Sequence, residues 1–139
     1  MSLYYARLFS PRAVFDASVD LAVLQGEKGA DQAAPYLRRA AISAVNLSEV
    51  AGKLTDAGMT TGDVRELLGS LGLVVVSFDE EAAHNAAQLR QVGGAQSLSL
   101  GDRACLALAR SIGLTAFTTD RFWERSAREA GIELRIIRR

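Results

Sequence analysis

The chain has 139 residues, a formal net charge of zero and an apolar fraction of 49%. This length and composition fit one domain with a real hydrophobic core and exclude a disordered chain. Many nucleic-acid-binding proteins are strongly basic, and this chain is not. If it binds RNA, its basic residues must therefore be clustered on one side.

Cysteine usage and hydropathy restrict the compartment. The single cysteine, Cys105, lies in an apolar helical stretch, where a small buried hydrophobe is expected rather than a reactive thiol. One cysteine cannot form an internal disulfide, which favours a reducing compartment. No apolar run is long enough to span a bilayer, and residues 1–12 lack the continuous apolar stretch of a signal peptide. We therefore expect a cytoplasmic protein without membrane association.

Short apolar runs alternate with longer amphipathic segments along the chain. Strands are expected over residues 13–15, 41–45, 73–76, 114–118 and 132–137. Helices are expected over residues 17–25, 31–39, 46–57, from 60 or 61 to 71, 80–91, 99–113 and 121–130, with a glycine-rich loop at 93–97.

Strands that alternate with helices predict an α/β fold, a three-layer α/β/α sandwich with a mainly parallel central sheet. Residues 13–139 would form this single domain, and residues 1–12 would be an N-terminal extension or a tag remnant. In such sheets the binding crevice lies beyond the carboxyl ends of the strands, where the strand order reverses. Acidic residues at those strand ends are therefore the first candidates for a functional site.

Four acidic residues stand at such positions. Asp16 and Asp120 each directly follow a predicted strand, whereas Glu49 and Asp102 lie in the first turn of a predicted helix. In a doubly wound sheet, three of them emerge at the same edge, and the fourth can reach that edge from its helix. The predicted fold therefore brings the four carboxylates together.

A helix cap accounts for each acid when it is taken singly. Asn46 with Glu49, and Ser99 with Asp102, have the spacing of a capping box. The two aspartates that follow strands could be plain N-caps. Capping does not require the four acids to converge, whereas a hard divalent cation such as Mg²⁺ does. Their joint placement favours a magnesium site, at which one or two ions could activate water against a phosphodiester.

Four segments carry a resemblance to a known family. They are VFDAS (14–18), ISAVNLSEV (42–50), LSLGDRACLA (98–107) and TTDR (118–121). In order and spacing they resemble a PIN-domain ribonuclease and, within that superfamily, the VapC toxins of bacterial VapBC toxin–antitoxin pairs. The resemblance covers residues 13–137.

The resemblance implies a PIN-like nuclease domain and a magnesium-dependent endoribonuclease, the toxin of a type II toxin–antitoxin system. Asp16, Glu49, Asp102 and Asp120 would be its catalytic and metal-site residues, with Mg²⁺ or Mn²⁺ as the cofactor. It further implies an RNA substrate, a cognate VapB-type antitoxin that blocks the site, and a homodimer. The alternative is a non-catalytic binding or regulatory protein of the same fold, against which the four intact acids argue.

Two departures from the family are visible. Residues 1–12 are longer than the family usually needs, and Asp20 occupies a position that is more often apolar. Asp20 could be a surface residue of the first helix or an additional acid behind the site. Neither departure affects the four acids.

Other side chains are weaker candidates. The hydroxyls of Ser18 and Thr118 could orient a carboxylate or a water molecule, although local turn bonding explains them equally well. Arg103 and Arg121 each follow a site acid and could hold RNA phosphates or antitoxin acids. Trp123 could stack on a base but is expected to pack its helix onto the sheet or a partner subunit.

Overall fold

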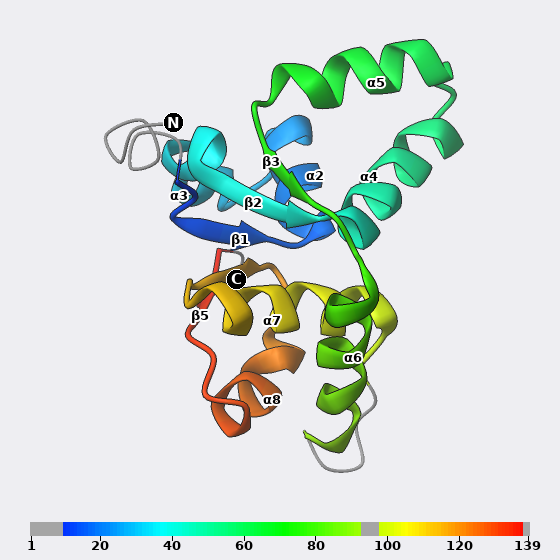
Figure 1. Ribbon diagram of the computed structural model, residues 1–139. Helices are drawn as coiled ribbons and strands as arrows, with labels where there is room; N and C mark the ends of the chain where they lie inside the picture. Colours follow the sequence, from blue (N-terminus) through cyan, green and yellow to red (C-terminus); the bar gives the residue numbers. More distant parts are fainter. Residues whose placement is uncertain (1–9, 93–97, 138–139) are drawn as a thin grey trace.

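The computed structural model describes residues 10–92 and 98–137, in which a parallel sheet lies between two layers of helices (Figure 1). The strand order is β3-β2-β1-β4-β5, and every neighbouring pair is parallel. The strands are β1 (Ala13–Phe15), β2 (Ala40–Ser43), β3 (Val74–Val76), β4 (Ala116–Thr118) and β5 (Leu134–Ile136). The predicted α/β/α architecture with a parallel sheet is therefore confirmed.

Helices cover both faces of this sheet (Figure 1). One layer contains α2 (Ala17–Gln25), α3 (Ala30–Ala33), η1 (Ala34–Arg39), α4 (Ala44–Asp56) and α5 (Thr61–Ser70). The other contains α6 (Glu80–Gln88), η2 (Leu89–Gln91), α7 (Leu100–Ile112), η3 (Arg121–Trp123) and α8 (Glu124–Glu129). No helix within the described ranges combines the length and the apolar character needed to cross a lipid bilayer.

Alternate residues of each strand face opposite layers, because side chains alternate across a sheet. In β1, Val14 belongs to the core shared with α6, α7 and α8, whereas Ala13 and Phe15 belong to the core under α2. In β2, Ala41 and Ala40 divide in the same way. Both faces of the central strands are thus buried, which explains why these strands are apolar throughout rather than alternating.

The helix predicted over 31–39 is wrong in type. The chain instead forms one turn of α-helix, α3, followed by the 3₁₀ helix η1, with Pro35 in the first turn of η1. A continuous α-helix would require an N–H from Pro35 and would press its ring against the carbonyl of Asp31. The 3₁₀ segment places the proline where its missing N–H is tolerated.

The boundary between β2 and α4 also differs from the prediction of a strand over 41–45. Ser43 caps α4, since its Oγ accepts a hydrogen bond from the N–H of Val45 at 3.2 Å. The helix consequently begins at Ala44, two residues earlier than predicted. Asn46 is therefore not a helix cap, and Glu49 lies in the second turn of α4 rather than the first.

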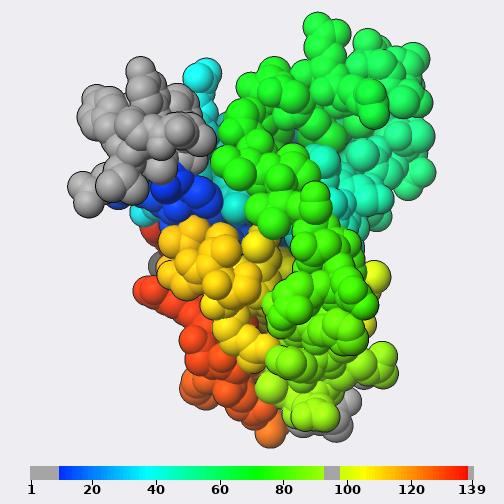
Figure 2. Space-filling model, in the orientation of Figure 1, coloured from blue at the N-terminus to red at the C-terminus, as the bar shows by residue number. Residues whose placement is uncertain are grey.

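Residues 1–9 and the loop predicted at 93–97 lie outside the described residues, so the interpretation of residues 1–12 as an extension stays a prediction. Within the described part, α4 and α5 pack together and form a lobe at the upper right of the space-filling view (Figure 2). Its apolar interior includes Ile42 of β2, Val50 and Leu54 of α4, and Val64 of α5. This lobe fixes the position of α4, the helix that carries Glu49.

Ile42→Ala should destabilise the protein strongly. The side chain of Ile42 is fully buried between β2 and the α4–α5 lobe, so the truncation removes buried methyl groups and leaves a cavity. We expect a loss of about 2–5 kcal/mol in the free energy of unfolding. The matched variant Ile112→Ala truncates a side chain that is 41% exposed and should cost about 0.5 kcal/mol or less. Urea unfolding measures both, and equal losses would contradict this account of the core.

Candidate functional site

The strand order reverses at β1, because the chain builds β2 and β3 on one side and then returns to place β4 on the other. Asp16 follows β1 and Asp120 follows β4, so both lie at this switch point. The side chains of Asp16, Glu49, Asp102 and Asp120 all line one open cleft beyond the carboxyl ends of the strands. The structure therefore brings together the four acids that the sequence singled out.

Asp16 is the most firmly held of the four. Its Oδ1 accepts hydrogen bonds from the hydroxyl of Ser18 (2.6 Å) and from the N–H of Val19 (3.0 Å). Its Oδ2 accepts one from the hydroxyl of Thr118 (2.7 Å). The carboxylate thus caps α2 and ties the end of β1 to the end of β4 in a single arrangement.

Ser18 and Thr118 are both used to hold this carboxylate. The hydroxyl of Ser18 also accepts from the N–H of Thr119 (3.1 Å), and that of Thr118 accepts from the N–H of Asp120 (3.1 Å). The sequence left two roles open for these hydroxyls, orienting a carboxylate or forming local turn bonds, and each hydroxyl does both. Asp16 and the segment that carries Asp120 are linked through these two side chains.

Burial raises the pKa of Asp16 to about 6, and the nearby charge of Asp102 adds to this effect. The hydrogen bonds from Ser18, Thr118 and Val19 lower the pKa and offset part of the burial. Because burial and the neighbouring negative charge disfavour the ionised form of Asp16, a positive charge that enters the cleft would stabilise its carboxylate. The site is thus electrostatically prepared for a cation.

Asp102 and Asp120 combine a capping role with exposure to the cleft. Asp102 and Ser99 form the predicted capping box at the start of α7, in which Oδ2 of Asp102 accepts from the N–H of Ser99 (3.0 Å). Oδ1 of Asp120 accepts from the N–H of Phe122 (2.9 Å) and caps η3. Among the described residues, the second oxygen of each carboxylate has no hydrogen-bond partner. Each aspartate therefore keeps one oxygen for a ligand.

Glu49 reaches the cleft from α4 by a different route. Its Oε1 accepts a hydrogen bond from Nδ2 of Asn46 (2.9 Å). A Cβ built on Gly101 would lie 2.6 Å from Oε2 of Glu49 and 2.7 Å from its Cδ. The carboxylate therefore occupies space that only a glycine leaves open at the start of α7.

Sequence reasoning missed Lys53, which lines the same cleft. Asn46, Glu49 and Lys53 follow one another at intervals of three and four residues on α4, and so they share one helix face. Among the described residues, the ammonium group of Lys53 has no ion-pair or hydrogen-bond partner. The helical spacing from Glu49 was the available signal.

The two arginine candidates differ in their surroundings. Arg103 is partly buried, and its guanidinium donates to the carbonyls of Leu98 (3.4 Å) and Ala86 (3.2 Å). It thereby joins α6 to the segment before α7. Arg121 is exposed beside Asp120, without a side-chain partner in the described parts of the chain. Contact with a substrate or an antitoxin stays a prediction for both, and Arg121 is the one whose charge is available.

Three further residues are buried beneath the cleft. Asp20 is fully buried on α2, not a surface residue, and burial together with the charge of Asp16 raises its pKa to about 8. Cys105 is also fully buried, and burial raises its pKa further from the range of a reactive thiol. Trp123 is 1% exposed and packs against the sheet, so its ring is not available to stack on a base.

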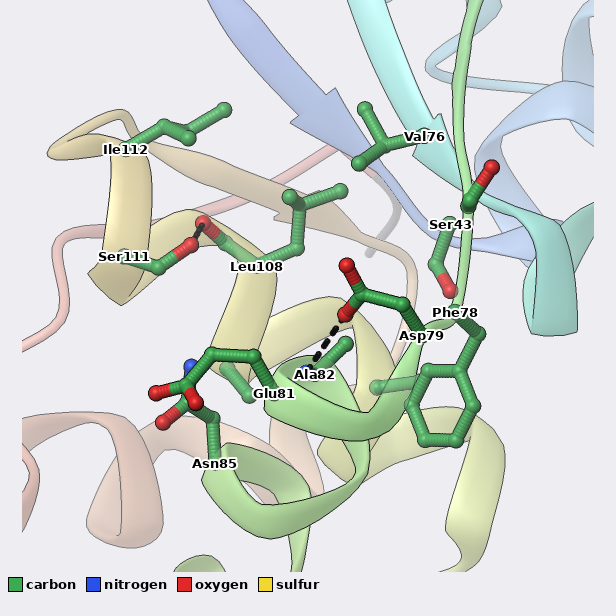
Figure 3. A pocket seen from close by; sticks show the side chains of 13 residues that line it. Ser43, Val76, Phe78, Asp79, Glu81, Ala82, Asn85, Leu108, Ser111 and Ile112 are labelled. Carbon is green, nitrogen blue, oxygen red and sulfur yellow. Dashed lines mark hydrogen bonds between the residues drawn. The ribbon is translucent and has the colours of Figure 1, made fainter.

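A second hollow lies between β3, α6 and α7 (Figure 3). Its walls include the apolar side chains of Val76, Phe78 and Leu108. Its two acids, Asp79 and Glu81, both lie at the start of α6, which Asp79 caps by accepting from the N–H of Ala82 (2.9 Å). No set of acids from different elements converges here. The acidic cleft is therefore the candidate site.

The cleft offers hard oxygen ligands, but they are not drawn into a tight cluster. Within residues 10–92 and 98–137, no three acidic, histidine or cysteine side chains are grouped closely enough to hold a metal ion between them. Mg²⁺ usually keeps several of its water molecules and is bound through one or two carboxylates. Spread carboxylates with unused oxygens therefore fit this cation, and they also fit Mn²⁺.

Asp20→Asn should flatten the pH dependence of stability in EDTA. The folded-state pKa of Asp20 is about 8, against 3.8 without burial, so the stability linked to its proton is complete below the lower value and is lost as the pH rises through the higher one. Asp16, with a pKa of about 6, completes its change earlier. The free energy of unfolding should therefore fall by up to about 1.4 kcal/mol per pH unit between about pH 6 and 8 in the parent.

In Asp20→Asn this fall should be largely absent. Asp31→Asn, which changes an exposed acid in the first turn of α3, is the matched control and should follow the parent. Urea unfolding at several pH values measures all three proteins. Parallel curves for the parent and Asp20→Asn above pH 6 would show that the buried carboxyl does not titrate in this window.

Comparisons with known proteins bear on this fold and its cleft. A family model described as PIN domain matches residues 13–129. The comparison with curated proteins gave no match. A toxin–antitoxin complex from Klebsiella pneumoniae is 22% identical with a TM-score of 0.65, over 80% of this chain and 89% of that chain.

Two more solved structures share the fold. VapBC2 from Rickettsia felis, bound to a DNA fragment from its promoter, is 13% identical with a TM-score of 0.69, over 89% of this chain and 97% of that chain. VapC20 from Mycobacterium tuberculosis, described as a sarcin–ricin loop cleaving toxin, is 17% identical with a TM-score of 0.66, over 81% of this chain and 93% of that chain. At these identities the likeness concerns the fold. Because the family model spans most of the sequence and includes all four acids, the chain belongs to the PIN domain family, and its fold is that of VapC-type toxins.

Proposed function

We propose that the chain is a magnesium-dependent endoribonuclease that cleaves RNA phosphodiesters in the acidic cleft. One observation carries the proposal, which is the convergence of four carboxylates from different parts of the chain on one open cleft. At least three of these carboxylates keep an oxygen without a partner among the described residues. Helix capping explains the backbone hydrogen bonds of the three aspartates, but it explains neither the position of Glu49 nor this convergence.

The donor set supports Mg²⁺, with Mn²⁺ as a possible substitute, held by Asp16, Glu49, Asp102 and Asp120. When bound, such a cation supplies charge stabilisation at the phosphate and lowers the pKa of water. Burial, with a smaller contribution from the charge of Asp102, raises the pKa of Asp16, and a bound cation would counteract both effects. Gly101 leaves room for the Glu49 carboxylate at the start of α7.

The chain's own residues then have separable roles. Asp16 is fixed by Ser18 and Thr118, so its carboxylate requires no rearrangement when a ligand arrives. Lys53, on the wall of the cleft, is placed to offset the negative charge of an RNA phosphate. Arg121 at the rim could hold a neighbouring phosphate or an acid of a protein partner.

The partners belong to the same proposal. Similar solved structures include toxin–antitoxin complexes, some of them bound to DNA. We therefore propose that this chain is the toxin of a type II pair, that a cognate VapB-type antitoxin covers the cleft, and that the chain forms a homodimer. The alternative, a non-catalytic binding or regulatory protein of the PIN fold, differs in predicting RNA binding without cleavage.

Asp102→Asn should abolish metal-dependent cleavage while the protein stays folded. The amide oxygen of asparagine can still accept from the N–H of Ser99 and keep the capping box, but the charge toward the cleft is lost. We expect the cleavage rate of a structured RNA pool with Mg²⁺ to fall by about 100-fold or more. EDTA should have the same effect on the parent, and expression of the parent, but not of Asp102→Asn, should slow bacterial growth.

The matched control is Asp63→Asn, which removes an exposed acid from the first turn of α5 and should cleave like the parent. Equal cleavage by Asp102→Asn and the parent would place the activity elsewhere or in a contaminant. RNA binding without cleavage by the parent would favour the non-catalytic alternative. Melting curves of all three proteins exclude unfolding as the cause of any loss.

Lys53→Gln should weaken RNA binding and reduce its salt dependence. Each phosphate contact in a single strand contributes about 0.7 to the slope of log affinity against log salt concentration, so the loss of one contact should lower the slope by about that amount. The chain has two lysines, and the control is Lys28→Gln, which changes the other lysine, exposed on the loop after α2. Fluorescence anisotropy with a labelled RNA in Ca²⁺, at several salt concentrations, gives the slopes. An unchanged slope in Lys53→Gln would exclude a phosphate contact.

A further inference from the structure

Asn46 joins two of the acid-bearing elements of the cleft. Its side chain is 1% exposed. Its Nδ2 donates to Oε1 of Glu49 at 2.9 Å and to the carbonyl of Gly101 at 3.0 Å. The first contact lies within α4, and the second crosses to the start of α7, one residue before Asp102. A single amide group therefore ties the orientation of Glu49 to the helix that carries Asp102.

The orientation of this amide is fixed by its neighbours. Both neighbours of Nδ2 are hydrogen-bond acceptors, so the opposite orientation would place Oδ1 against a carboxylate and a carbonyl. Oδ1 must therefore face the other way, where it is buried and has no partner among the described residues. Asn46 also lines the acidic cleft. Burying an unpaired acceptor costs stability, which indicates that the side chain is kept for what its amide holds.

Glu49 needs such a partner because its own surroundings leave it free. The residue is exposed, and a glutamate side chain on a helix surface otherwise samples many rotamers. Gly101 leaves space for its carboxylate but provides no hydrogen bond to it. The contact with Asn46 is the one hydrogen bond that the carboxylate of Glu49 makes within the described ranges.

From these contacts we infer that Asn46 is a positioning residue, which holds the Glu49 carboxylate over the start of α7 in the orientation that binds a divalent cation. This inference rests on the proposed function. Asn46 acts through Glu49, to which its Nδ2 donates.

The test is a double-mutant cycle in Mn²⁺ affinity, measured by isothermal titration calorimetry without RNA. The four proteins are the parent, Asn46→Leu, Glu49→Gln and the double variant. Leucine has a similar size and removes both polar atoms of the amide. Loss of a group that orients a metal ligand weakens affinity by about 10–100-fold, and we expect a loss of this size in Asn46→Leu. In the Glu49→Gln background the same substitution should cause little further loss.

A melting curve in EDTA separates positioning from a structural role. The substitution removes the unpaired Oδ1 but also the two hydrogen bonds that Nδ2 donates to Glu49 and Gly101. The melting temperature of Asn46→Leu should therefore be lower than that of the parent but remain above the temperature of the titration, so that Mn²⁺ binding is measured on folded protein. Asn85→Leu, at a half-buried asparagine of α6 that lines the other hollow, is the matched control and should keep the parent's Mn²⁺ affinity. If Asn46→Leu does not fold, Asn46→Thr, which keeps one donor, enters the same cycle and should show a smaller loss.

Each outcome decides the inference. A loss of affinity in Asn46→Leu that nearly disappears in the Glu49→Gln background supports it. Unchanged affinity, or equal losses in both backgrounds, would overturn it while leaving the metal site of the proposed function intact. A parent protein that binds no Mn²⁺ at all would overturn the proposed function and this inference with it.

Discussion

The cleft depends on the hydrogen bonds around the carboxylate of Asp16. Thr118 is 102 residues away in sequence, yet its hydroxyl lies 2.7 Å from Oδ2, while Val19 and Ser18 hold the other oxygen. These contacts cap α2, link the end of β1 to the end of its neighbour β4, and hold a carboxylate at the point where the strand order reverses. Burial makes the arrangement costly for a charged group. A cation bound in the cleft, as proposed, would stabilise this buried carboxylate and offset the cost.

Helix starts supply most of the remaining geometry. A carboxylate at a helix N-terminus is stabilised by the partial positive charge of the unpaired N–H groups. Asp102 and Asp120 are both stabilised in this way, each through one oxygen. This stabilisation offsets the repulsion between two negative charges that face the same cleft. Glu49 has no such support, because it lies inside α4 and is oriented by Asn46 and the space over Gly101. The site therefore combines rigid aspartates with one glutamate that depends on a neighbouring helix.

The sequence predicted the layers, the parallel sheet and the placement of the four acids around one edge of that sheet, because apolar runs and strand ends are local signals. The role of these acids as metal ligands stays a prediction. The sequence misplaced the start of α4, since Ser43 and Asn46 are both good caps and only the packing of β2 decides between them. The role of Asn46 was missed for the same reason, as its second acceptor, Gly101, is 55 residues away. Asp20 was left open because a single sequence does not say whether a polar residue faces the core. Lys53 belongs to no motif, so its spacing of four residues from Glu49 was the one signal in the sequence, and the cleft shows that its side chain lines the wall.

The double use of Asp102 and Asp120 also shapes what mutation can do to this protein. Alanine at either position removes the charge and the cap together, which costs stability as well as ligand binding. Asparagine removes the charge but keeps an oxygen that can cap, and in the genetic code it is a single base change from aspartate. A gene under pressure to silence the cleft thus has a short route to a chain that still folds, persists in the cell and presents an almost unchanged surface to whatever binds it.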